Sequence, residues 1–150
     1  MKGYFKMNKS LNKEIRALMD TVMKDMYLLD KEIETTFGLT SARIFTLLAF
    51  NTSEIMKMKE LSNSLSLTSS TMTRMIDNLV KEGLVERGHE PRDRRLVIVK
   101  LTNEGKKLTD NIKVYKEKYF KSVMENVESD GKEMASSLKI LISAFERFKS

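Results

Sequence analysis

Apolar residues near the N-terminus recur at steps of three and four residues. They lie at Leu11, Ile15, Leu18, Val22, Met26, Leu29 and Ile33. This spacing places them on one face of a helix over residues 10–36, and Gly38 is a typical residue for its end. Because so long a helix would extend beyond a small central domain, we predict that its apolar face packs against a second copy of the chain. Packing within one chain is the alternative.

The rest of the chain follows the same rules. Helical spacing predicts short helices at 39–50, 57–65 and 67–83 and two closing helices within 103–149. Their expected N-caps and C-terminal stop are Thr40, Thr68, Thr102, Ser129 and Gly83. Residues 84–87 and 95–101 have the composition of strands and predict a two-stranded hairpin. The expected fold is therefore mainly α with one small β-hairpin.

Two of the short helices have the arrangement of a helix-turn-helix, in which the second helix enters the DNA major groove. On a helical wheel of 69–82 one face is apolar: Met72, Met75, Ile76, Leu79 and Val80. The opposite face holds Ser70, Arg74, Asp77, Asn78 and Lys81, with Ser69 and Thr73 at the border. Small hydroxyl residues allow close approach to base edges, and Arg74 can reach a guanine or a phosphate. An ordinary amphipathic helix with a solvated polar face is the alternative.

The hairpin tip concentrates positive charge. Residues 87–100 carry five positive and two negative side chains, a local net charge of +3. Such a tip would repel itself, but it is favourable beside a polyanion, and a slim β-ribbon can bring arginine into the minor groove. Asp93 stands among Arg92, Arg94 and Arg95 and is expected to hold one of them in a bidentate pair that stiffens the tip. The alternative is a solvated run of charges.

Composition narrows the remaining classes of function. The chain of 150 residues has a net charge of +6, no cysteine and one histidine, His89. Disulfides and thiolate metal sites are thereby excluded, and a histidine-rich zinc site is disfavoured. We expect a cytoplasmic protein with no cofactor or metal and no membrane partner, since no apolar run approaches the ~20 residues of a membrane span. No nucleotide-binding or catalytic motif argues for an enzyme.

Residues 60–108, which include "STMTRMIDNLVKEGLVER" and "PRDRR" followed by "LVIVKLTNEGKKL", resemble the core of a MarR-type winged helix-turn-helix transcription regulator. The order of the flanking helices fits the same family. The resemblance implies a single domain over 1–150, with dimerisation helices at 10–36 and 103–149 and a DNA-binding lobe at 40–102. It also implies a homodimer whose recognition helices, here 69–82, enter successive major grooves, and a wing, here 88–95, at the minor groove.

The resemblance assigns roles to residues of the wing. The family's Asp-x-Arg motif, which shapes and anchors the wing, matches Asp93 and Arg95. Arg92 and Arg94 are then candidates for groove and backbone contacts. Family members often respond to small lipophilic or phenolic effectors bound between the dimer helices and the DNA-binding lobe. Lys57 departs from the pattern, since Ser or Thr usually caps this helix, and the absence of cysteine excludes a thiol-oxidation switch.

These observations lead to one main hypothesis. The chain is expected to be a dimeric transcriptional regulator that binds a specific sequence of double-stranded DNA. It is expected to act as a repressor that a small molecule releases from the DNA. The residues expected to contact DNA or to shape its contacts are Thr68, Ser69, Ser70, Thr73, Arg74, Arg92, Asp93, Arg94 and Arg95. Two alternatives stay open: a non-specific architectural DNA-binding protein, and a helical interaction protein with no nucleic-acid partner.

Overall fold

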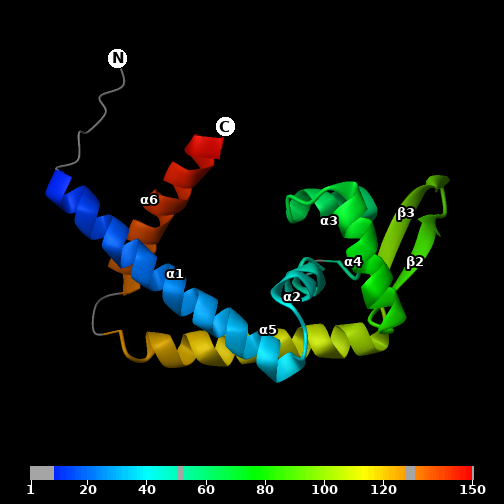
Figure 1. The fold of residues 1–150 in the computed structure, drawn as a ribbon, viewed down its shortest axis with the longest axis horizontal. Coiled ribbons are helices and arrows are strands. Elements are labelled where there is room, and N and C mark those ends of the chain that lie inside the picture. The colour runs from blue at the N-terminus through cyan, green and yellow to red at the C-terminus, as the bar shows by residue number, and fades with distance from the viewer. Residues whose placement is uncertain (1–8, 51–52, 128–130, 150) are drawn as a thin grey trace, which may run out of the picture. The chain divides into compact units, whose positions relative to one another are not determined.

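Helices make up most of the computed structural model, which describes residues 9–50, 53–127 and 131–149 (Figure 1). The chain divides into two compact units, Met1–Ile112 and Lys113–Ser150. The first unit contains the candidate site. Its elements are α1 (Lys9–Phe37), α2 (Ser41–Leu48), β1 (Ile55–Lys57), α3 (Met58–Ser64), α4 (Ser69–Lys81), β2 (Val85–Glu90), β3 (Asp93–Leu101) and the first part of α5 (Asn103–Met124).

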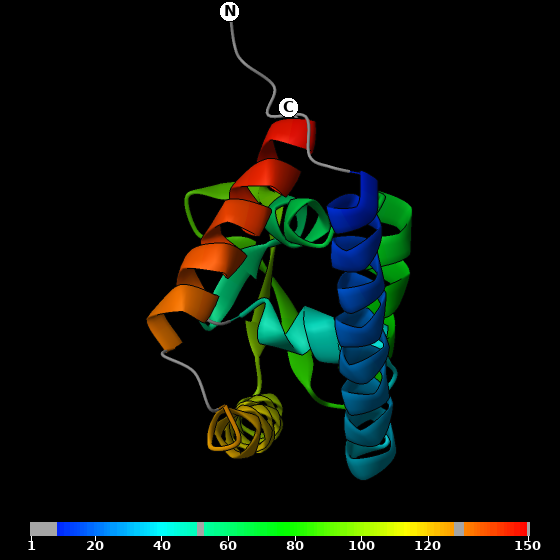
Figure 2. The same cartoon turned by 90° about the vertical axis from the view of Figure 1, so that its left-hand side faces the viewer.

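The helices expected in this unit are confirmed, with small changes at their ends. Figures 1 and 2 show α1 as one continuous helix. Gly38 follows it with φ at +65°, a left-handed conformation that glycine adopts without strain. Thr40 occupies the N-cap of α2, but its side chain makes no capping hydrogen bond. The carboxylate of Glu34 instead accepts hydrogen bonds from the backbone N–H and the hydroxyl of Ser41.

The prediction of a two-stranded hairpin was incomplete, because the sheet has three antiparallel strands in the order β1-β3-β2. Strand β1 pairs Ile55 with Lys100 and Lys57 with Ile98. The two predicted strands are also longer than expected, so that only Pro91 and Arg92 remain between them. Strand β1 has three residues of alternating exposure, which is too short for a pattern of period two to be recognised.

The apolar core of the first unit is formed by side chains from its helices and from this sheet. Ten of its larger side chains are at most 2% exposed: Leu29, Ile33, Leu47, Leu61, Met72, Ile76, Leu79, Val85, Val99 and Ile112. Each such burial contributes about 1.5–3 kcal/mol. Val80 was expected on the apolar face of α4 but is 40% exposed. The face that packs on the core is therefore narrower than the wheel suggested.

The start of α5 is held close to the sheet. Thr102 caps this helix as predicted, since its hydroxyl oxygen accepts the N–H of Gly105 at 3.0 Å. The hydroxyl of Thr102 donates to the carbonyl of Gly83, and its N–H donates to the carbonyl of Leu84. The helix that follows the wing is thus anchored to the loop that precedes the wing.

The second unit consists of the end of α5 and helix α6 (Gly131–Lys149). The predicted cap Ser129 lies outside the described residues. Large apolar side chains of α6 are exposed, among them Ile140 at 69%, Ile142 at 55% and Phe148 at 90%. This helix therefore carries an apolar surface that the chain alone leaves in solvent.

Candidate nucleic-acid interface

Helix α4 presents a polar N-terminal half to solvent. Its N-cap is Thr68 as predicted: the hydroxyl oxygen accepts the N–H of Thr71 at 3.3 Å. Ser69, Ser70, Thr73 and Arg74 are all exposed. Because Met72 and Ile76 fix one face in the core, Ser70 and Arg74 lie on the opposite face, and Ser69 and Thr73 lie at its border. The helix can thus offer hydroxyl and guanidinium groups to a groove.

The turn before α4 brings it close to α3. Ser66 adopts φ of +52°, and the N–H of Leu67 donates to the carbonyl of Ser62 at 2.9 Å. At the other end of α3 the Glu60 carboxylate accepts the N–H of Lys57 at 3.0 Å. This contact is one half of a capping box and satisfies the N–H of Lys57, whereas the ammonium group of Lys57 cannot accept the N–H groups of the first helical turn.

The wing is a hairpin with an irregular strand. The register pairs His89 with Val97, but the next residue, Glu90, pairs with Asp93. Arg94, Arg95 and Leu96 therefore have no direct partner on β2 and form a bulge. All three are exposed. The bulge, together with the turn residue Arg92, gathers three arginines at the tip of the wing.

Asp93 and Arg95 form the bidentate pair that the sequence predicted. Asp93 Oδ1 accepts the backbone N–H of Arg95 at 3.0 Å and its Nε–H at 3.2 Å, while Oδ2 lies 3.5 Å from Arg95 Nη2. These hydrogen bonds, that of the Arg95 side chain first, lower the pKa of the Asp93 carboxyl below its ordinary value. The carboxylate is charged at neutral pH and holds the base of the bulge in one shape.

Arg87 does not belong to the group of tip charges in which the sequence placed it. Its Nη1 lies 2.7 Å from Oδ1 of Asp77, and its Nη2 donates to the carbonyl of Thr73 at 3.0 Å. Both acceptors are on α4, so the side chain joins strand β2 to the candidate recognition helix.

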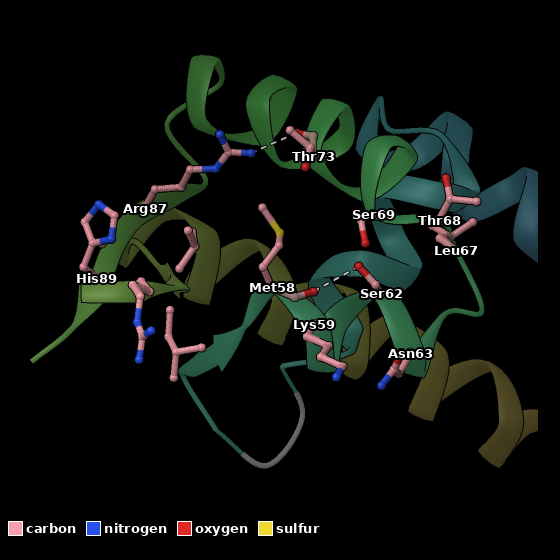
Figure 3. Close-up of a pocket in the computed structure, with 14 residues that line it drawn as sticks. Met58, Lys59, Ser62, Asn63, Leu67, Thr68, Ser69, Thr73, Arg87 and His89 are labelled. Atoms are coloured by element: carbon pink, nitrogen blue, oxygen red, sulfur yellow. Dashed lines mark hydrogen bonds between the residues drawn. The ribbon is translucent and has the colours of Figure 1, made fainter. Parts of the chain in front are cut away.

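A hollow of about 860 Å³ lies between α3, the start of α4 and the hairpin (Figure 3). Residues of α3 and the turn that line it are Met58, Lys59, Ser62, Asn63, Leu67 and Thr68. Residues of α4 and the hairpin that line it are Ser69, Thr73, Arg87, Gly88, His89, Arg95, Leu96 and Val97. Figure 3 shows the Arg87 side chain extending from the hairpin to Thr73 along one wall.

The residues predicted for DNA contact are not all on this hollow. Thr68, Ser69, Thr73 and Arg95 line it. Arg74 lines a smaller hollow of about 260 Å³ between α2 and α4, together with Thr40, Arg43, Thr71, Met75 and Asn78. Ser70, Arg92, Asp93 and Arg94 line neither hollow.

Sequence reasoning missed Lys59 and Asn63, two exposed polar residues of α3 on the wall of the larger hollow. Their position in the first helix of a helix-turn-helix was the only available signal. Within the described ranges no group of three or more histidine, cysteine, aspartate or glutamate side chains is placed to hold a metal ion. Nor is any helix of the described part both long and apolar enough to cross a membrane.

Residues 39–97 match the model of the MarR family. The transcriptional repressor YetL of Bacillus subtilis is 33% identical over 88 residues, which are 59% of this chain and 52% of YetL. The multiple antibiotic resistance protein MarR of Escherichia coli is 36% identical over 74 residues, 49% of this chain and 51% of that protein. The chain thus spans about half the length of each.

Solved structures share the fold over most of the chain. A mutant of E. coli MarR, solved with operator DNA, has a TM-score of 0.67 at 24% identity and covers 88% of this chain and 95% of its own. Staphylococcus aureus MarR, solved with salicylate and kanamycin, has a TM-score of 0.79 at 15% identity and covers 93% of each chain. The arrangement of α4 and the hairpin is therefore that of a winged helix.

Proposed function

We propose that the chain is a winged-helix transcriptional regulator of the MarR family, that it binds a specific sequence of double-stranded DNA as a homodimer, and that it represses transcription. One observation carries the proposal: the exposed polar half of α4 lies beside a hairpin whose arginine tip is fixed by the Asp93–Arg95 pair. The helix would enter the major groove and the tip would reach the minor groove.

Each residue then has a definite role. Ser69, Ser70 and Thr73 approach base edges or phosphates, and Arg74 reads a base. Thr68 caps the helix and leaves the first N–H groups of α4 available to a phosphate. The exposed Arg92 and Arg94 contact the groove and the backbone, while Asp93 and Arg95 shape the wing. The larger hollow would then face the sugar–phosphate strand between the two grooves.

Exposed apolar side chains support the dimer. In α1 the apolar stripe is buried at Leu29 and Ile33 but 61% exposed at Leu18 and 59% exposed at Val22. Surface of this kind on a helix is typical of an interface. A two-fold dimer would place its two recognition helices about 34–36 Å apart, one turn of DNA.

Relatives support the direction of regulation and the effector. YetL is named a repressor, and S. aureus MarR was solved with salicylate. We propose that a small lipophilic or phenolic molecule favours a dimer whose lobes no longer match the spacing of the grooves. Such a ligand acts only through its different affinities for the two states.

Fluorescence anisotropy tests the proposal. The probes are the duplex upstream of the chain's own gene, the preferred duplex selected from a random library, and a scrambled duplex of equal length. Salt runs from about 50 to about 200 mM. A preference of about a thousandfold or more for a defined sequence is expected. Equal binding to every duplex would indicate an architectural DNA-binding protein, and no binding to any would indicate an interaction protein without a nucleic-acid partner.

A further inference from the structure

We propose that Arg87 and Asp77 form a clamp that positions the recognition helix against the wing and thereby determines sequence specificity. The clamp is defined here as the contacts of the Arg87 guanidinium with Asp77 and with the carbonyl of Thr73. The inference rests on the proposed function, and it makes Arg87 a positioning residue that acts through α4 without touching DNA.

The clamp is anchored in the sheet. Arg87 pairs in register with Val99 of the central strand β3, and Val99 is fully buried. The other side of the clamp consists of two groups one helical turn apart on α4. A planar guanidinium that donates to two fixed acceptors specifies an orientation as well as a distance, which the single ammonium group of lysine does not.

Other contacts of α4 with the sheet are less directional. The buried face of α4 consists of Met72, Ile76 and Leu79, and apolar packing is proportional to area and has little angular preference. The C-terminal end of α4 has its own polar tie, from Arg43 of α2 to the C-cap residue Glu82 at 2.7 Å. The contacts of Arg87 thus join the middle of α4 to the hairpin, and we infer that they fix the rotation of α4 relative to the wing.

The charge of Asp77 supports this role. A carboxylate on the exposed side of a helix that binds DNA would by itself repel phosphate. The side chain of Asp77 is 46% exposed, and the Arg87 guanidinium lies against it. Because Arg87 and Asp77 sum to zero charge, the pair adds orientation to the interface and no net attraction for the polyanion.

The decisive variant is Asp77→Asn, because the two explanations predict opposite signs. Removing a negative charge near DNA should strengthen binding to every duplex if electrostatics alone matters. If the clamp positions α4, Asp77→Asn should bind the preferred duplex about tenfold more weakly and bind the scrambled duplex as well as wild type or better. Anisotropy titrations on both duplexes measure the ratio.

Glu86→Gln is the matched control. Glu86 precedes Arg87 on β2, and its carboxylate pairs across the hairpin with Lys100 at 3.5 Å. The Glu86→Gln substitution therefore removes the same charge as Asp77→Asn without changing a contact of α4. It should leave the specificity ratio unchanged. Melting curves of both variants check that the fold is intact, and the exposed, nearly isosteric Asp77→Asn change is expected to leave the melting temperature close to that of wild type.

Arg87→Met separates positioning from direct contact. The salt slope is the slope of the logarithm of the binding constant against the logarithm of the salt concentration. Removing a residue that contacts a phosphate lowers its magnitude by about 0.9 on both duplexes. Arg87→Met is therefore made together with Asp77→Asn, so that no unpaired carboxylate is left near DNA, and the clamp then predicts an unchanged slope with a loss confined to the preferred duplex. A reduced slope on both duplexes, or Asp77→Asn binding the preferred duplex as tightly as wild type, overturns the inference. Absence of any sequence preference in the wild-type chain would instead show that the proposed function is wrong.

Discussion

At the scale of single residues, the contacts that shape the candidate interface join partners at very different separations along the chain. The Thr68 cap joins residues three apart, and the Asp93–Arg95 pair joins residues two apart. Arg87 and Thr73 are 14 positions apart. Nothing in the sequence shows that this arginine faces a helix, because the packing of β2 against α4 determines it. The sequence therefore predicts the charge of Arg87 but not its contacts with α4.

Arg94→Ala and Arg74→Ala should have different effects on DNA binding. Arg94 lies in the bulge at the tip of the wing, where it would contact the DNA backbone, so its loss should weaken binding to all duplexes and reduce the salt slope by about 0.9.

Arg74 lies on α4, and its loss should cost about 1–3 kcal/mol on the preferred duplex and relax the choice at one base pair. Anisotropy titrations of preferred and mismatched duplexes over a salt series measure both. Unchanged affinity of Arg94→Ala at moderate salt would show that the wing assignment is wrong.

At the scale of elements, long amphipathic helices were predicted well and the sheet was not. Strand β1 was missed because its three residues carry no recognisable period, and it forms only because β3 offers a free edge. The hairpin strands extend to the tip because antiparallel pairing continues through Glu90 and Asp93, past residues of poor strand propensity. Tertiary pairing, which the local pattern does not encode, decided these bounds.

Gly105 allows α5 to start where it does. A Cβ at this position would overlap the carbonyl oxygen of Leu84, a backbone atom that also accepts the N–H of Thr102. Gly105→Ala must therefore displace the start of α5 or the loop before β2, at a cost of about 1–3 kcal/mol. Urea unfolding followed by circular dichroism measures the loss.

Gly131→Ala, at the start of α6, is the control because, among the described residues, no atom outside its chain neighbours and the backbone of its own helix lies within 4 Å of its Cβ position. This variant should keep or slightly raise the stability of the protein, since alanine favours a helix. Equal unfolding midpoints for the Gly105→Ala variant and the wild-type protein would contradict the close approach of α5 to Leu84.

The junction of α1 and α2 should be sensitive to acid. The hydrogen bond from Lys31, followed by those from Ser41, lowers the pKa of Glu34 from 4.5 to about 2. Because the folded pKa is depressed, these contacts stabilise the fold fully above the unfolded value and lose their effect as the pH falls towards 2. Wild type should therefore melt above Glu34→Gln at pH 7, and the difference should shrink between about pH 4.5 and 2. A difference that is constant with pH would show that the charge of Glu34 is not involved.

At the scale of the whole molecule, the apolar stripe of α1 is longer than the part of it that a single chain buries. Because the end of this stripe is exposed, Leu18→Glu should separate the dimer. One chain alone would hold only one half-site, so the variant should lose far more affinity for the preferred duplex than for a single half-site. Met23→Glu is the control: Met23 is 57% exposed but lies roughly 140° around the helix from Leu18. Sedimentation velocity gives the oligomeric state, and circular dichroism confirms that both variants stay helical. If Leu18→Glu sediments as wild type does, the stripe of α1 is not the dimer interface, and the apolar side chains of α6 become the surface to test.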